Sequence, residues 1–232
     1  MNNQKNTYQP IKAISHIIAF LGLFLLEQLP LSFLILDKKD LGKNYSIYEK
    51  LAPVATIICL IISAAIIIYT FKRVNKFPNY KFTKKTWTII LVGTLLTALI
   101  NLATVPFIHG KIDNVDALNQ VAGKSIIILL IFSILVAPIL EEIIFRGIFM
   151  NWFFVKQPLI AVIASGLVFG YVHAPFNAQT NWLYALSKIL LGIVLAGVYY
   201  RTKNIKANIT VHFLNNLLAI LSGLVMSGVI LF

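Results

Sequence analysis

The chain has 232 residues, of which 59% are apolar and only 12% are charged, and its mean hydropathy is +0.84. A soluble globular domain carries about 25% charged residues, so this composition excludes an ordinary soluble enzyme or binding module and indicates a protein of the lipid bilayer. The net charge of +12 does not indicate a nucleic-acid partner, because the basic residues occupy short loops between apolar runs. A single cysteine, Cys59, excludes an internal disulfide and a metal site built from paired cysteines.

The first apolar run, from about Ile14 to Leu36, is longer than the core of a secretory signal, and no small-residue cleavage site follows it. We therefore expect it to remain as a spanning helix. Seven apolar segments of this kind follow one another along the chain, at residues 13–36, 51–71, 86–108, 124–150, 158–175, 182–200 and 207–231. Each is near the ~20 residues that a spanning helix needs, although the fifth is short.

The backbone of a lipid-embedded segment must satisfy its own hydrogen bonds, and these runs lack the alternation of barrel strands, so the segments are predicted to be helices. The expected fold class is all-α: a polytopic membrane helix bundle with about seven transmembrane helices, forming a single integral membrane domain over residues 1–232. The tail at 222–232 contains Gly223 and Gly228 and could form an eighth, short helix.

The charged loops predict an orientation in the membrane. The loop after the second segment and the loop before the last segment carry only basic residues, whereas loops 37–50 and 109–123 mix acidic residues with lysines. Basic loops favour the cytoplasmic side, so we expect a multi-pass protein of the cell membrane with a cytoplasmic N-terminus. The Lys-, Asn- and Ile-rich composition points to a bacterium with AT-rich DNA.

Ionisable side chains within the apolar segments are the candidates for function, because each costs several kcal/mol in lipid. They are Glu27, Glu141, Glu142, Arg146, His173, Lys188 and His212. We expect Glu27 to accept a hydrogen bond from a neighbouring helix, and Lys188 is a second-tier candidate for the site.

The fourth segment holds two adjacent glutamates. Glu142 and Arg146 are four residues apart, so they share a helical face and can form an ion pair that neutralises both groups. Glu141 points about 100° away, and its own i+4 position is Phe145, so it is the better candidate for a general base. Pro138 lacks an N–H and is expected to leave the carbonyl of Ile134 without its helical partner. An alternative is that both glutamates only anchor the helix at the headgroups.

Two further segments each add a histidine with a companion one helical turn away. Phe169 precedes His173 in the fifth segment, and Asn216 follows His212 in the seventh. Together with the glutamates they would supply a base, two imidazoles that can bind a metal or polarise a carbonyl, and an amide that can stabilise an oxyanion. Because no HExxH motif is present, the base and the imidazoles must come from different helices.

These three pieces, Glu-Glu-x-x-x-Arg at 141–146, Phe-x-x-x-His at 169–173 and His-x-x-x-Asn at 212–216, resemble in order and type the signature of the CPBP family. This is the family of CAAX prenyl endopeptidases and bacteriocin-processing or immunity proteins, also called Abi. The resemblance covers roughly residues 124–217, which would be the catalytic core. The first three segments match only as hydrophobic spans.

The resemblance implies an intramembrane endopeptidase that cleaves a membrane-associated protein or peptide precursor. Glu141 would activate water; the residues that bind this water or a metal and stabilise the oxyanion would be His173, His212 and Asn216. Glu142 and Arg146 would hold the site together. Zinc or another divalent metal, held by Glu141, His173 and His212, is an open alternative to a glutamate-activated water alone.

Two other functions stay open: a non-proteolytic bacteriocin-immunity or scaffold protein that retains the motif, and a small-solute transporter. Against a transporter, the chain has no paired halves. One difficulty concerns depth. His173 falls near the outer end of its segment, whereas Glu141 and His212 fall towards the cytoplasmic side, an offset of roughly 15 Å at 1.5 Å per residue. A short, tilted fifth segment or a different loop around 151–157 would remove it.

Overall fold

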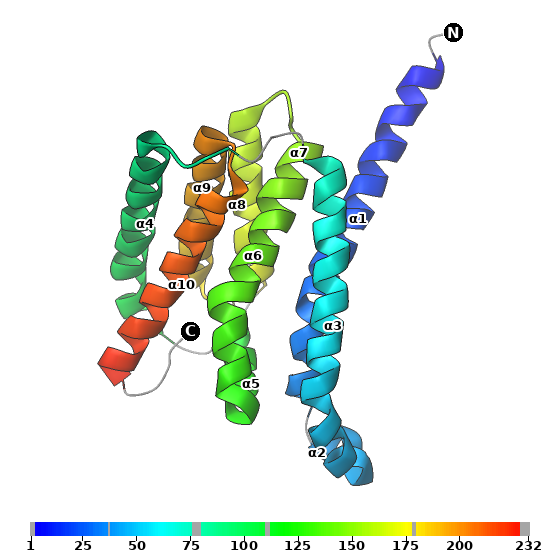
Figure 1. Cartoon of the computed structure of the whole chain (residues 1–232), viewed down its shortest axis with the longest axis vertical. Coiled ribbons are helices and arrows are strands. Elements are labelled where there is room, and N and C mark those ends of the chain that lie inside the picture. The colour runs from blue at the N-terminus through cyan, green and yellow to red at the C-terminus, as the bar shows by residue number, and fades with distance from the viewer. Residues whose placement is uncertain (1–2, 37, 76–79, 110–111, 178–179, 228–232) are drawn as a thin grey trace. The chain divides into compact units, whose positions relative to one another are not determined.

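The computed structural model describes residues 3–36, 38–75, 80–109, 112–177 and 180–227 (Figure 1). Two compact units divide the chain, Met1–Val74 and Asn75–Phe232. The described residues contain helices and no strand, in agreement with the predicted all-α class. The single integral domain over 1–232 stays a prediction.

The first unit is a pair of long helices that contact each other, α1 (Asn3–Ile35) and α3 (Tyr45–Val74). Two short turns, α2 (Lys38–Leu41) and η1 (Gly42–Asn44), connect them, and Gly42 adopts a φ of +53°, which favours glycine. Glu27 on α1 is fully buried. Its carboxylate accepts a hydrogen bond from Gln28, the next residue on the same helix, and among the described residues it accepts none from a neighbouring helix, contrary to our expectation.

The second unit contains the remaining helices. It begins with α4 (Lys84–Thr104) and the short turn η2 (Val105–Phe107). A continuous helical run follows, in which two π-helical stretches interrupt the α-helix: α5 (Asp113–Ile131), η3 (Phe132–Val136), α6 (Ala137–Glu142), η4 (Ile143–Phe149) and α7 (Met150–Trp152). The last three helices are α8 (Pro158–His173), α9 (Trp182–Thr202) and α10 (Ile205–Ser227).

Each of the seven predicted segments coincides with one of these helical runs, so the predicted helix bundle is confirmed. Within the described residues, five helices are long and apolar enough to cross a membrane. Helix α8, which corresponds to the fifth predicted segment, is also apolar but shorter, as the sequence indicated. Helix α10 continues without a break through Gly223 to Ser227. The rest of the proposed eighth helix, residues 228–232, lies outside the described residues.

Helix α9 is the centre of the second unit, where it contacts α8, α4 and α10 (Figure 1). An asparagine at each end ties it to the residues that flank α4. Asn181 caps α9 by accepting from the Tyr184 N–H, and its Nδ2 donates to the carbonyl of His109 at 2.9 Å. Asn204 accepts from the Lys206 N–H and donates to the carbonyl of Tyr80 at 2.9 Å. Helix α4 is therefore anchored to α9 at both ends.

Helices α8 and α9 approach each other closely because glycines line their contact. A methyl group added at Gly170 would lie 2.9 Å from the Ile189 Cα, and one at Gly166 would lie 2.8 Å from the Ile193 backbone nitrogen. The spacing of these two glycines is the small-xxx-small pattern that lets membrane helices pack backbone to backbone. This contact fixes α8, and hence the position of His173 at its end, against α9.

Candidate active site

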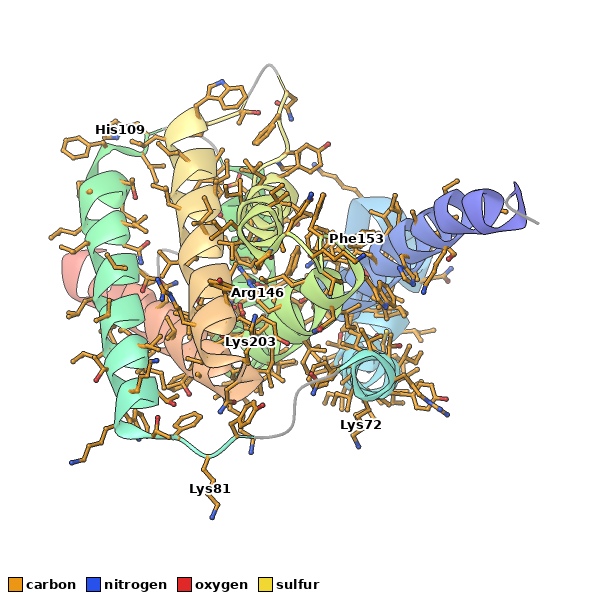
Figure 2. All side chains as sticks on the ribbon, turned by 90° about the horizontal axis from the view of Figure 1, so that it is seen from above. Lys72, Lys81, His109, Arg146, Phe153 and Lys203 are labelled. Carbon is orange, nitrogen blue, oxygen red and sulfur yellow. The ribbon has the colours of Figure 1, made fainter. Side chains whose placement is uncertain are left out.

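Arg146 and Glu142 form a fully buried ion pair inside the second unit. Arg146 Nη1 lies 3.0 Å from Glu142 Oε1, and both side chains have zero exposure. The second guanidinium nitrogen, Nη2, donates to the carbonyl of Gly192 on α9 at 2.8 Å. Figure 2 shows Arg146 in the interior of this unit, whereas Lys81 projects outwards. The i,i+4 pair predicted from spacing is therefore present, and it also joins η4 to α9.

Two residues of α10 complete the surroundings of Glu142. His212 Nδ1 lies 2.9 Å from Glu142 Oε1, and Asn208 Nδ2 donates to Glu142 Oε2 at 3.1 Å. Asn208 also donates to the carbonyl of Leu195 on α9 at 2.5 Å. Both carboxylate oxygens thus accept hydrogen bonds, as a buried charge requires.

Phe169 on α8 is the aromatic centre of the site. Its ring stacks on the His173 ring at 4.3 Å between centroids and meets the His212 ring edge-on at 5.8 Å. The Arg146 guanidinium lies 4.8 Å from the ring centroid, within the range of a cation–π interaction. The Phe169 carbonyl also bonds to His173 Nδ1 at 2.9 Å. One side chain therefore orients both histidines and covers the arginine.

Glu141 faces the other ring nitrogens of the two histidines. Its Oε2 lies 3.7 Å from His173 Nε2 and 3.8 Å from His212 Nε2. The Glu141 side chain is 10% exposed and His173 19%, compared with 0% for Glu142 and 3% for His212. Glu141 and His173 therefore form the less buried half of the cluster.

The distance between His173 and Glu141 corrects the predicted offset of roughly 15 Å. The helical run that carries Glu141 continues for eleven residues to Trp152, which places Glu141 in the middle of the helix, and α8 ends at His173 after only 16 residues. Measured from the connecting turn, Glu141 is then about 16 Å deep and His173 about 22 Å.

Asn216, the last predicted site residue, lies one turn after His212 on α10. Its Nδ2 donates to the carbonyl of Ser133 in η3 at 2.9 Å. All six predicted residues thus belong to the second unit. The second-tier candidate Lys188 is half-buried, with its Nζ 5.0 Å from the centroid of the Tyr184 ring.

Asn208 was missed by the sequence analysis. The signal was available, because Asn208 lies four residues before His212 and therefore on the same face of an apolar helix. A polar side chain in that position, facing the residues of a candidate site, is a potential partner for them.

The predicted ligands of a divalent metal are Glu141, His173 and His212. These side chains are the donor types that zinc prefers, and the Nδ1 atom of each histidine bonds to an oxygen, as in many metal ligands. In the part of the chain that the structure describes, no group of three or more His, Cys, Asp or Glu side chains meets the geometry of a metal site. The metal stays a prediction.

Comparisons with known proteins identify the family. The family model of type II CAAX prenyl endopeptidase Rce1-like proteins matches residues 123–218. UPF0177 protein YaiF of Lactococcus lactis subsp. lactis (strain IL1403) is 32% identical over 167 residues, which cover 67% of this chain and 74% of that protein. No solved structure matches the chain. The resemblance carried by the three motifs is therefore confirmed: the chain is a multi-pass membrane protein that belongs to the CPBP family of intramembrane endopeptidases.

Proposed function

We propose that Glu141 activates a water molecule that hydrolyses a peptide bond of a membrane-associated protein or peptide precursor. The observation that carries this proposal is the position of Glu141 Oε2, 3.7 and 3.8 Å from the Nε2 atoms of His173 and His212. Those distances exceed the 2.7–3.2 Å of a direct hydrogen bond but suit groups that share one bridging molecule.

The hydrogen bonds on the far side of each imidazole support this assignment. His173 Nδ1 faces a backbone carbonyl and His212 Nδ1 faces the Glu142 carboxylate, and both of those oxygens can only accept. In the neutral imidazoles the proton is therefore on Nδ1, and each Nε2 presents a lone pair towards Glu141. A water molecule has two O–H donors, so it can donate one to the Glu141 carboxylate and the other to the Nε2 lone pair of either histidine.

The hydrolysis then uses each residue in one role. Glu141 takes one proton from water while the water oxygen attacks the peptide carbonyl carbon, and the second O–H of that water donates to the Nε2 atom of His173 or His212, which orients it. The Asn216 amide N–H donates to the resulting oxyanion. Glu141 returns the proton to the leaving amide nitrogen as the carbon–nitrogen bond breaks, which gives a carboxylic acid and an amine. Glu142 and Arg146 do not touch the substrate but hold His212.

A divalent metal would be held by Glu141, His173 and His212, and it would supply Lewis-acid polarisation of the carbonyl and of the bound water. No step above depends on it. Elemental analysis of the purified full chain, next to Glu141→Gln and His212→Ala variants, measures whether a metal binds. A stoichiometric metal that both variants lose would assign it to these residues.

The substrates that we propose are prenylated C-termini, bacteriocin or pheromone precursors, or membrane-anchored proteins. For the test, the purified full chain in liposomes is incubated with a farnesylated peptide that ends in a CAAX sequence, with the same peptide lacking the lipid, and with a bacteriocin precursor. Mass spectrometry measures cleavage. Glu141→Gln is expected to lower the rate by about 10²–10⁴-fold, because it removes the base while keeping the shape of the side chain.

The matched control is Glu49→Gln, the same change at an exposed position of α3, which should leave the rate unaltered. Cleavage by Glu141→Gln at the wild-type rate would refute the proposal. A non-proteolytic immunity or scaffold protein would instead keep its protection or partner binding in the Glu141→Gln variant.

We also propose that the bacterial cytoplasm faces the end of the second unit that holds Tyr80 and Asn204. Their hydrogen bond brings the lysines before α4 and the basic turn between α9 and α10 to the same end, and basic loops favour the cytoplasm. In a Cys59→Ala background, an impermeant thiol reagent on intact cells should label His109→Cys and spare Lys81→Cys. Labelling of Lys81→Cys but not of His109→Cys would show that the protein has the opposite orientation in the membrane.

A further inference from the structure

Three asparagine side chains form a continuous line of hydrogen bonds that crosses the second unit. Asn101 Nδ2 on α4 donates to Asn215 Oδ1 on α10 at 3.0 Å, and Asn215 Nδ2 donates to Asn216 Oδ1 at 3.0 Å. Asn216 Nδ2 then donates to the carbonyl of Ser133 in η3 at 2.9 Å. We call these three residues the amide chain. It connects α4, which carries no motif of the family, to a residue of the proposed reaction centre.

The acceptor at the end of the amide chain exists because of Pro138. In η3 the Ala137 N–H donates to Phe132, five residues back, which is the π-helical pattern. The next N–H in that series would come from residue 138 and bond to Ser133, but proline has none. The Ser133 carbonyl therefore takes its donor from Asn216. That the Ile134 carbonyl lacks its helical partner stays a prediction.

A carbonyl can only accept a hydrogen bond, so Ser133 fixes the direction of the whole amide chain. The atom of Asn216 next to Ser133 must be its nitrogen, which turns Oδ1 towards Asn215. Asn215 must then offer its own nitrogen, which turns its oxygen towards Asn101. The Asn216 nitrogen has a second hydrogen, which Ser133 does not use. This orientation favours Asn216 as a hydrogen-bond donor, whereas a metal ligand would need its oxygen.

We propose that Asn101 and Asn215 are positioning residues that hold the Asn216 amide with its N–H₂ group directed for donation to the oxyanion. This inference rests on the proposed function. Asn215 is 4% exposed, and the two other amides are half-buried, so each lost partner would leave a poorly hydrated polar atom. Without the Asn215 donor, the Ser133 carbonyl alone would orient the Asn216 amide, and its N–H₂ group would be held less firmly towards the developing negative charge.

The test compares Asn101→Leu with Thr97→Val in the liposome cleavage assay, using the probe that the wild type cleaves. Thr97 lies one turn earlier on α4, is 1% exposed, and its hydroxyl donates to Thr94 of its own helix. Asn101→Leu is expected to lower kcat by about tenfold with KM within about twofold, less than the 10²–10³-fold loss of an oxyanion donor itself. Thr97→Val should change neither constant by more than about twofold.

A double variant separates positioning from general damage to the bundle. In an Asn216→Ala background, Asn101→Leu should lower kcat no further, because the group that it positions is gone. A further tenfold loss in that background would overturn the proposal, and so would equal effects of Asn101→Leu and Thr97→Val.

The outcome is distinguishable from a failure of the proposed function. If wild-type protein cleaves and Glu141→Gln does not, the assay tests the amide chain alone. If the wild type cleaves no probe, the proposed function fails, and thermal unfolding tests the amide chain without a substrate. The unfolding temperature of Asn101→Leu with Asn216→Ala should then fall by less than the sum of the two single losses. A decrease equal to the sum of the two single decreases in unfolding temperature would show that Asn101 and Asn216 are not coupled, and it would overturn the proposal.

Discussion

Glu141 and Glu142 are neighbours in the sequence, yet they belong to two differently built halves of the site. The inner half consists of Glu142, Arg146 and Asn208, where both carboxylate oxygens accept hydrogen bonds and no side chain is exposed. The outer half consists of Glu141 and His173, which are partly exposed and face each other at 3.7 Å. His212 joins the halves through its two ring nitrogens. The rotation of about 100° between neighbouring residues of one helix thus separates the fully buried carboxylate of Glu142 from the less buried carboxylate of Glu141.

The largest expected difference between the halves is in stability. Glu142→Gln should lower the free energy of unfolding by about 3–5 kcal/mol, because it leaves the Arg146 charge buried without its counter-ion. Glu141→Gln should change the free energy of unfolding by less than about 1 kcal/mol while lowering the cleavage rate by about 10²–10⁴-fold. Unfolding of the purified proteins in mixed micelles measures both values. Equal losses of unfolding free energy in the two variants would mean that the two glutamates share one environment, and the division into an inner and an outer half would be wrong.

A second change tests whether the loss arises from the unpaired charge. Adding Arg146→Met to Glu142→Gln removes that charge and keeps a long apolar side chain beneath Phe169. This double variant should recover part of the stability that Glu142→Gln loses, because buried ion pairs can often be replaced by apolar groups. It should stay inactive, since His212 Nδ1 no longer faces a carboxylate.

A smaller effect is expected from Asn208, which belongs to the inner half alone. Asn208→Leu removes the donor to Glu142 Oε2, which then lacks a partner, and also the side-chain donor to the Leu195 carbonyl, which keeps its helical N–H. The expected loss is about 2–3 kcal/mol of unfolding free energy. Activity per folded molecule should fall only modestly, because Glu142 still accepts from Arg146 and His212. Asn151→Leu is the control for loss of a buried amide outside the site, since Asn151 bonds to Tyr199 and Gly147.

Much of the architecture could be predicted from the sequence, because the thickness of a bilayer fixes the length of an apolar helix. The inner half was partly predictable for a similar reason. Glu142 and Arg146 are related by a local spacing of four residues, and the structure pairs them at 3.0 Å. Contacts set by the geometry of one helix do not depend on how the other helices pack.

The rest of the site depends on how different helices pack against one another, and this packing cannot be predicted from the spacing of residues along one helix. The depth of His173 depends on where α8 begins and on the glycines that hold it against α9. Asn101 carries no motif, and it becomes relevant only because α4 packs beside α10. The π-helical stretch at 132–136 pairs the Ala137 N–H with the Phe132 carbonyl, and Pro138 was its only sign in the sequence.

The smallest expected effect concerns how the outer half is held in place. A methyl group at Gly170 would lie 2.9 Å from the Ile189 Cα and nitrogen, and because backbone atoms cannot turn aside, α8 must move away from α9. Gly170→Ala should cost about 1–2 kcal/mol and lower kcat by about tenfold, since His173 is three residues away. Gly197→Ala on α9 is the matched control.

No heavy atom outside its own helix backbone lies within 4 Å of a Cβ placed at Gly197, so alanine there should be neutral or stabilise the helix by up to about 1 kcal/mol. Because no hydrogen bond of the Glu142–Arg146 pair comes from α8, Gly170→Ala should cost less stability than Asn208→Leu but lower kcat by more. If Gly170→Ala and Gly197→Ala behave alike, α8 can adjust freely, and the contact with α9 does not set the position of His173.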